Sequence, residues 1–503
     1  RRGQRRVHRA AMKLILAALA VCAVASAQDV NVKNSYAADG TLTMGNVASC
    51  DTTKDYFPWK VPSGAMASKA KFEVTYHKYY KIVKTTGATP KTYLLVQRGC
   101  PTPAGVTADV TLPVPLKGVA VASASWFKFF EAMGERHAIK GVNGYYSTSP
   151  CMNKLFADSK VTDMSLYSYN ETTALYQGAA DPSAFTGTIE AHFVGSWTKG
   201  KNAVYVGASA EPTYQAASEW VHYISAFFNR EEEVGLFSTR SRNRWVCSST
   251  NADVSVQPKV VWTDYYPASY GPSSPAGWVI NQCSAEGDAA FRHCELITAA
   301  RGVPVTAFTK ASSPDLYDKG NGQLLGVSDA DMKAFAKDAD VIVIANNYCD
   351  SFSGTGTVET CNAHWKGVVA KLEGTSAHTN DKVFDIGRQA TPTGGSGYFE
   401  ASVMPEALLQ DMIKATQAGQ PDHEFVYLRR MISEGVGNQI KCADQPAAVG
   451  CVPTQADLAA RCASTVTDPA PSEGSSACSA ASALGASSAL AALLAVLAVF
   501  LSQ

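Results

Sequence analysis

The longest helical pattern in the chain reads Pro212-Thr-Tyr-Gln-Ala-Ala-Ser-Glu-Trp-Val-His-Tyr-Ile-Ser-Ala-Phe-Phe-Asn-Arg-Glu-Glu-Glu-Val-Gly235. Pro212 stands where prolines are common, in the first turn of a helix, and Gly235 is the expected end. Between them, apolar side chains recur at the three- and four-residue spacing that places them on one helical face. This stripe comprises Trp220, Tyr223, Ile224, Phe227 and Phe228.

Short apolar strands alternate with helical stretches on both sides of this helix. Strands of this kind are expected at 118–122, 191–195 and 203–207 before it, and at 258–262, 303–307, 341–345 and 382–386 after it. Strands that alternate with helices build mostly parallel sheets covered by helices. The sequence therefore predicts an α/β fold with two Rossmann-like lobes joined by one long helix. The alternating pattern at 71–83 adds a β-rich N-terminal extension.

We expect seven segments along the chain. They are upstream residues with a signal peptide (1–27), the β-rich extension (28–110), an N-lobe (111–210), the bridging helix (211–240), a C-lobe (241–440), a Cys-containing stalk (441–475) and a GPI-attachment signal (476–503).

The N-terminal pattern is typical of a secretory signal peptide. Lys13 precedes an apolar stretch, and Ala25-Ser26-Ala27 forms a small-residue cleavage site before Gln28. The alternative is an N-terminal membrane anchor, but the apolar stretch is short of the ~20 residues that span a bilayer. We therefore expect export.

The C-terminal pattern favours a GPI anchor. Small residues around Ser475 and Ser476 are followed by a polar spacer and by the apolar block 489–501, with no basic residue after it. A membrane-spanning tail is the alternative, although this block is also shorter than a bilayer requires. We expect Ser475 or Ser476 to carry the anchor, which places the protein on the extracellular face of the plasma membrane.

Charge excludes one class of function. The chain has 44 basic and 44 acidic side chains, but six of the basic ones precede residue 28, where there are no acids. Removing that stretch leaves 38 basic against 44 acidic side chains, a net charge of −6. A mildly acidic chain without basic runs is a poor nucleic-acid binder, so no nucleic-acid partner is expected.

The cysteines agree with an oxidising compartment. Of 13 cysteines, Cys22 leaves with the signal peptide and Cys478 with the tail, and most of the other eleven are expected in disulfides. Asn170-Glu171-Thr172 is a glycosylation acceptor. Cys361 and His364 resemble half of a zinc site, but no second half with matching spacing exists. The close-spaced disulfide candidates are Cys283 with Cys294, Cys349 with Cys361, and a pair among Cys442, Cys451 and Cys462.

Several stretches, in order from about residue 54 to 435, resemble a known family. The chain is similar to the periplasmic substrate-binding proteins of ABC importers for ferric siderophores, haem and cobalamin, and to their cyanobacterial and algal branch with an extended N-terminus. The resemblance implies the helical-backbone periplasmic-binding-protein fold. It rests on Asp55-Tyr56-Phe57-Pro58, 72–77, 95–99, 114–116, Ser123-Ala124-Ser125-Trp126, 193–197, 219–229 and Tyr398-Phe399-Glu400.

The resemblance implies a ligand site between the lobes, formed by aromatic and arginine side chains at strand ends. By position, the candidates are Trp126, Tyr145 and Tyr146 in the first lobe, and Trp262, Tyr265, Tyr266, Arg388 and Tyr398 in the second. Aromatic faces suit a flat macrocycle or a catecholate, and a guanidinium suits an anionic ligand.

Each candidate also has a structural alternative. Trp126 lies at helical spacing with Phe129 and Phe130, so it is equally suited to core packing. The segment Tyr265-Tyr266-Pro267 is expected in a loop, and Tyr398 follows the glycine-rich stretch 394–397, which favours ligand contact at both places.

The resemblance implies capture of a metal chelate (a ferric siderophore, haem or cobalamin) for uptake, without a resident cofactor or catalysis. A GPI anchor would place the protein on the plasma membrane of a eukaryote, where no bacterial permease is expected. We therefore expect the captured ligand to be handed to an uptake receptor or another transporter, or to be taken up by endocytosis. A ligand-less adhesion or cell-wall protein on the same fold is the alternative. An extracellular enzyme is a further one, although the sequence has no H-E-x-x-H or G-x-S-x-G motif.

Overall fold

The computed structural model describes most of the chain between residues 32 and 434. The predicted signal peptide, the predicted stalk, Ser475 and Ser476 lie outside the described residues. The segments not described are 1–31, 37–40, 43–48, 62–70, 87–89, 143–146, 165–166, 174, 179–187, 196–198, 268–272, 274, 284–290, 309–315, 320–321, 346–357, 390–400, 418–422 and 435–503.

The N-terminal extension is a four-stranded sheet in the order β1-β2-β3-β4. Strands β1 (Phe72–Tyr76), β2 (Tyr80–Thr85) and β3 (Lys91–Gln97) are antiparallel, and β4 (Val110–Val114) runs parallel to β3. A disulfide joins Cys50 to Cys100, a pair that the sequence spacing did not single out. The β-rich extension that the sequence predicts is therefore present.

The first lobe is built on a parallel sheet in the order β11-β10-β5-β6-β7. A separate hairpin, β8 (Tyr167–Asn170) with β9 (Leu175–Gly178), carries Asn170, the predicted glycosylation acceptor. The strands are β5 (Val119–Val121), β6 (Ile139–Val142), β7 (Thr162–Asp163), β10 (Ala191–Val194) and β11 (Ala203–Tyr205); between them lie the short helices η1 (Ala124–Trp126), α2 (Phe127–Ala132), η2 (Arg136–Ala138) and α3 (Pro150–Ala157), and η3 (Ala208–Ala210) follows.

The connection between the lobes differs from the single helix that we expect at 212–235. Two short helices, α5 (Tyr214–Ser218) and α6 (Trp220–Ser225), are followed by a break at Asn229, whose φ is 57°. Asparagine tolerates this left-handed backbone, which ends a helix. The long helix is α7 (Glu231–Asn251), which starts with three glutamates at its positive end and continues through Gly235.

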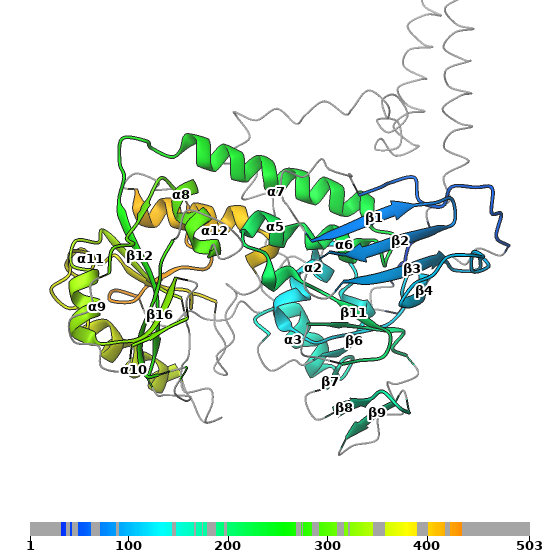
Figure 1. Ribbon diagram of the computed structural model, residues 1–503, viewed down its shortest axis with the longest axis horizontal. Coiled ribbons are helices and arrows are strands. Elements are labelled where there is room, and N and C mark those ends of the chain that lie inside the picture. The colour runs from blue at the N-terminus through cyan, green and yellow to red at the C-terminus, as the bar shows by residue number, and fades with distance from the viewer. Residues whose placement is uncertain are drawn as a thin grey trace, which may run out of the picture.

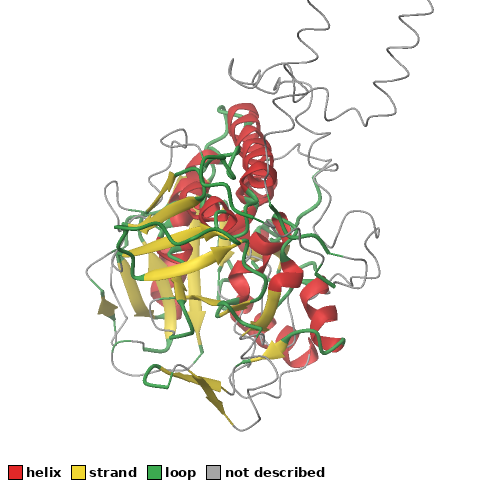
Figure 2. Cartoon of the chain, turned by 90° about the vertical axis from the view of Figure 1, so that its right-hand side faces the viewer, coloured by secondary structure: helices red, strands yellow, loops and turns green. Residues whose placement is uncertain are grey.

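Helix α7 joins the lobes (Figure 1). At its start, the buried Lys81 ammonium of β2 donates to Asn229 Oδ1 at 2.9 Å, to the Ala226 carbonyl at 2.7 Å and to the Glu231 carboxylate. At its far end, Ser249 accepts a hydrogen bond from Arg301 of the second lobe through its carbonyl, at 2.9 Å. Figures 1 and 2 show α7 along one side of the molecule, away from the β8–β9 hairpin.

The second lobe has a mixed sheet in the order β15-β16-β13-β12-β17-β18-β19, with β14 also paired to β12. Strands β14, β12, β17 and β18 are parallel, as expected, while the others are antiparallel additions. The strands are β12 (Lys259–Tyr266), β13 (Gly277–Asn281), β14 (Val303–Pro304), β15 (Tyr317–Asp318), β16 (Gln323–Val327), β17 (Val341–Ile344), β18 (Val383–Asp385) and β19 (Arg429–Arg430); the helices are α8 (Arg292–Ala299), α9 (Asp329–Phe335), α10 (Val358–Ala370), α11 (Ser376–Thr379) and α12 (Pro405–Thr416).

One hydrophobic core runs through the extension and both lobes. It includes Val83 of β2, Trp126 of the first lobe and Trp262, Val343 and Leu408 of the second. A separate cluster on the other face of the second sheet is covered by α9 and α10. The chain therefore has the predicted α/β fold with two lobes and one long helix, and the continuous core holds the lobes together. Among the described residues, no helix combines the length and apolar character that crossing a bilayer requires.

Candidate functional site

Each parallel sheet has a point at which the order of strands reverses. In the first lobe, β6 and β7 lie on one side of β5, and the chain then returns to place β10 on its other side. In the second lobe, β14 lies on one side of β12 and β17 on the other. Ligands of open α/β sheets bind outside the carboxyl ends of the strands at such reversal points. The candidate site is therefore bounded by the carboxyl ends of β5, β10, β12 and β17.

At the first reversal point, a backbone hydrogen bond of 2.9 Å from Ala122 to Phe193 keeps the ends of β5 and β10 level. The turn after β5 is closed by Ser123, whose hydroxyl accepts from the Ser125 amide at 3.3 Å. The residue after β10 is Gly195. Short polar or small residues thus line both strand ends.

Trp126 lies in the hydrophobic core next to this turn. Core packing is the alternative to ligand contact that the sequence leaves open for this residue. Its side chain is 1% exposed and packs in the continuous hydrophobic cluster. Within the described part of the chain, its indole N–H makes no hydrogen bond. A buried donor without an acceptor costs about 1–3 kcal/mol, so this N–H is suited to an acceptor that those residues do not supply.

At the second reversal point, β12 extends three residues beyond its pairing with β17, which ends at Thr263. The expectation that Tyr265 and Tyr266 lie in a loop is therefore wrong, because antiparallel pairing with β13 keeps both in the strand. Side chains alternate along a strand, so Tyr265 and Tyr266 point to opposite faces. Tyr265 packs on the Trp278 ring at 4.9 Å, whereas Tyr266 shares the face of Trp262.

Trp262 is buried within a stack of rings. Its ring is parallel to that of His293 at 5.3 Å, and the Phe291 ring lies on His293, also at 5.3 Å. Burial lowers the pKa of His293 to about 3, so the imidazole is neutral. A ligand could reach the face of Trp262 that His293 covers only if this stack opened, and the Trp262 side chain is buried, at 5% exposed.

Asp264 is a site residue that sequence reasoning missed. It lies between Trp262 and Tyr266 on the same face of β12, and its Oδ2 accepts from Asn281 Nδ2 at 3.1 Å. Burial raises the pKa of Asp264 to about 6. Carboxyls with raised pKa values concentrate at functional sites, but a single Asp in an aromatic run gives no sequence signal for one.

Arg388 follows β18, the next parallel strand. Its Nη1 donates to Glu434 Oε2 at 2.9 Å, and both side chains are about one-third exposed (36% and 34%). A pair this exposed contributes only about 0–1 kcal/mol, so an anionic ligand can replace Glu434 at little cost.

The lobes contact each other through α8. The Arg292 guanidinium donates to the carbonyl of Glu211 at 2.8 Å and to that of Ala208, both at the end of the first lobe. Glu295 Oε2 accepts from the Tyr214 amide at the start of α5, at 2.7 Å. Burial raises the pKa of Glu295 to about 7 against the opposing effects of these hydrogen bonds and of Arg292.

Other candidates lie outside the described residues. These are Tyr145 and Tyr146 after β6, Tyr398 after β18, and Cys349, the expected partner of Cys361. The structure does join Cys283 to Cys294. His293 lies close to both sulfurs, but cysteines in a disulfide have no thiolate to offer a metal.

One His–carboxylate pair was not expected from the sequence. His423 Nε2 lies 2.6 Å from Asp411 Oδ1, and both side chains are buried. The same carboxylate accepts backbone N–H bonds from Val426, Tyr427 and Leu428. Because Asp411 is surrounded by these backbone groups, it fixes the segment before β19 and has no room to serve a reaction.

No protein-family model matches the chain, and no curated protein matches it either. Solved structures that resemble it include periplasmic solute-binding proteins, some of them of ABC transporters. A periplasmic binding protein from Veillonella parvula DSM 2008 has a TM-score of 0.42 and 10% identity, covering 69% of this chain and 98% of its own. A periplasmic heme-binding protein from Pseudomonas aeruginosa has a TM-score of 0.35 and 13% identity (62% and 96% covered), and an ABC-type Fe3+-hydroxamate transport protein from Saccharomonospora viridis DSM 43017 has 0.37 and 12% (60% and 94% covered).

Proposed function

We propose that this protein is a solute-binding protein that captures a small metal chelate (a ferric siderophore, haem or cobalamin) between its two lobes. The observation that carries the proposal is the pair of strand-order reversals, one in each lobe of a single chain. In open α/β sheets, ligands bind outside the carboxyl ends of parallel strands at such reversals, which is where we place the ligand. A ligand held at both reversal points would bridge the lobes.

The chemistry of the described residues supports an anionic, partly aromatic ligand. Arg388 supplies a planar cation that is easily released from Glu434, and Tyr266 supplies an aromatic face at the end of β12. The indole N–H of Trp126, which has no acceptor among the described residues, supplies a donor in the first lobe. Tyr145, Tyr146 and Tyr398 remain proposed contacts on the sequence argument alone, since they fall in segments that follow β6 and β18.

The continuous core supports capture by a nearly rigid protein. The lobes share one hydrophobic cluster and the hydrogen bonds of Arg292. Separating them would expose that apolar surface at about 25 cal/mol per Å². We therefore propose that ligand entry involves the loops at the strand ends, without wide opening of the lobes.

We also propose that the protein acts at the outer face of the plasma membrane, with a GPI anchor near Ser475 or Ser476. The signal-peptide and anchor patterns support this location, as do the disulfides Cys50–Cys100 and Cys283–Cys294. A phosphatidylinositol-specific phospholipase should release the protein from intact cells. Retention on treated cells would contradict the anchor and leave the ligand proposal standing.

The test of ligand capture is a titration of the purified full-length chain with haem, a ferric hydroxamate and cobalamin. We expect one class to bind with micromolar or lower Kd, and Arg388→Ala to weaken it by roughly tenfold or more. Arg240→Ala is the matched control, because it also removes one guanidinium. Arg240 is exposed on α7 and belongs to none of the strands whose carboxyl ends bound the candidate site. Absence of binding by all three would refute nutrient capture and favour the adhesion protein on the same fold.

A further inference from the structure

A small pocket lies at the opposite edge of the first-lobe sheet. It opens at the amino ends of β6 and β7, whereas the reversal point lies at their carboxyl ends. Its volume is about 140 Å³, well below the roughly 300–1,000 Å³ of sites for drug-sized ligands. The apolar side chains of Ile139, Leu155 and Val161 line one part of it. A pocket of this size suits a small ion and excludes a macrocycle.

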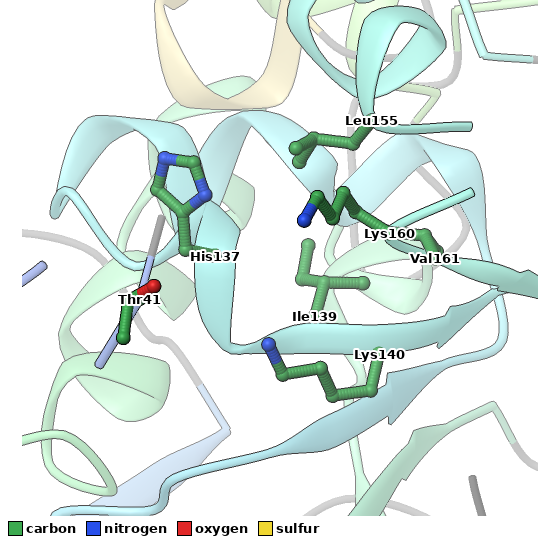
Figure 3. Close-up of a pocket in the computed structure, with 7 residues that line it drawn as sticks. All are labelled: Thr41, His137, Ile139, Lys140, Leu155, Lys160 and Val161. Carbon is green, nitrogen blue, oxygen red and sulfur yellow. The ribbon is translucent and has the colours of Figure 1, made fainter. Parts of the chain in front are cut away.

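The polar lining of this pocket is cationic. Lys140 and Lys160 reach it from the beginnings of β6 and β7, and His137 and Thr41 complete the lining. Figure 3 shows the two lysine nitrogens directed into the same space, with the His137 ring and the Thr41 side chain beside it. Three segments, at 41, 137–140 and 160, therefore place nitrogen and hydroxyl groups around one small volume.

These cations lack a counter-ion among the described residues. Neither Lys140 nor Lys160 forms an ion pair there, and burial and the charge of Lys160 lower the pKa of Lys140. Burial, Arg136 and Lys140 together lower the pKa of His137. Like charges held together in this way repel each other, and an anion placed between them would relieve that repulsion.

The nearby carboxylates are engaged elsewhere. Glu135 accepts from Arg230 Nε at 2.7 Å and from the Tyr36 hydroxyl at 2.6 Å, and the Tyr36 ring packs against His137. Asp158 pairs with Lys154 at 2.9 Å on the exposed side of α3. Neither acid neutralises the pocket.

We propose that this pocket binds a phosphate group, as inorganic phosphate or as the head of a small phosphomonoester. Lys140 and Lys160 would supply charge and N–H donors. The site is separate from the proposed chelate site, so it would add a second ligand to the protein and does not depend on the first.

The test is calorimetric titration of the full-length chain with inorganic phosphate, and in a second arm with glycerol 3-phosphate. We expect saturable binding of at least one of them, weakened roughly tenfold to a hundredfold in the double variant K140Q/K160Q. Lys154→Gln is the control: it removes one positive charge from the neighbouring α3 and should leave binding unchanged. If both compounds bind, the pocket accepts free phosphate as well as phosphate esters. If only glycerol 3-phosphate binds, the ligand is a phosphate ester.

Two results would overturn the proposal. One is no binding of either phosphate compound at millimolar concentration. The other is binding that K140Q/K160Q retains at full strength. Folding of the double variant is checked by its thermal midpoint without phosphate, which we expect to equal or exceed that of the wild type because the repulsion between the lysines is gone. If the double variant does not fold, Lys160→Gln alone, at an exposed position, must still weaken phosphate binding.

Discussion

The contact between Glu295 and the start of α5 should make the junction of the lobes sensitive to pH. The Glu295 carboxyl is part-buried against Tyr214, and its pKa rises from 4.5 to about 7 on folding. An acid whose pKa is higher in the folded state keeps its proton there more firmly than in the unfolded chain. Stability is therefore greatest below the unfolded value and falls as pH rises toward the folded value.

The size of this effect follows from the two pKa values. Between about pH 5 and about pH 8, the native state holds more protons than the unfolded chain, and the linkage relation gives a loss of about 2.5 kcal/mol. The substitution Glu295→Gln keeps an oxygen acceptor for the Tyr214 amide but carries no charge at any pH. The free energy of unfolding of the variant should therefore not show this loss. Relative to the wild type, it should rise by about 2.5 kcal/mol from about pH 5 to about pH 8.

Urea unfolding of wild type and Glu295→Gln at both pH values measures this difference, provided that the m-values agree. Other titrating groups, including Asp264, contribute the same pH dependence to both proteins, so their contributions cancel in the difference between them. Glu373→Gln is the control, because Glu373 is exposed and its substitution should change nothing. A pH dependence that differs by less than about 0.5 kcal/mol between wild type and Glu295→Gln would refute the reasoning.

The remaining predictions concern three other contacts. Lys81→Ala leaves the Glu231 carboxylate buried and unpaired, and should lower the free energy of unfolding by about 3–5 kcal/mol; a loss below about 1 kcal/mol in urea unfolding would contradict the role of this pair. Replacing both Cys50 and Cys100 by serine opens a loop with a sequence separation of 50 and should cost about 4 kcal/mol, seen as a lower thermal midpoint; an unchanged midpoint would contradict it. Asp411→Ala should cost at least about 3 kcal/mol and speed amide exchange at 426–428, whereas unchanged exchange would show that this carboxylate does not fix the segment.

The parallel framework was predictable because its strands are buried on both faces. Segment 341–345 is a short continuous apolar run, which is how a covered parallel strand appears in sequence. Segment 382–386 shows the same pattern less purely, because Lys382 and Asp385 stand among its apolar residues. The bridging helix was harder to place. Its apolar stripe runs up to Phe228, but the left-handed Asn229 interrupts the helix, and the long part begins at Glu231 with little apolar periodicity.

The candidate site was less predictable because it depends on strand order. Nothing in the sequence near Asp264 tells that β12 lies between β14 and β17, or that its last residues pair with β13. The period of two along β12 does predict that Tyr265 and Tyr266 face opposite ways, but only once the strand is known to continue through them. The pocket lined by Lys140 and Lys160 depends on tertiary contacts from four separate segments, so no local pattern marks it.

The central claim is that a metal chelate binds where strand order reverses in both lobes. Hydrogen–deuterium exchange of the full-length chain, with and without the chelate class that binds in titration, tests it most directly. We predict protection of the turn at 123–126 in the first lobe together with the end of β12 at 264–266 in the second. Protection confined to one lobe, or found only at the amino ends of β6 and β7, would contradict the account.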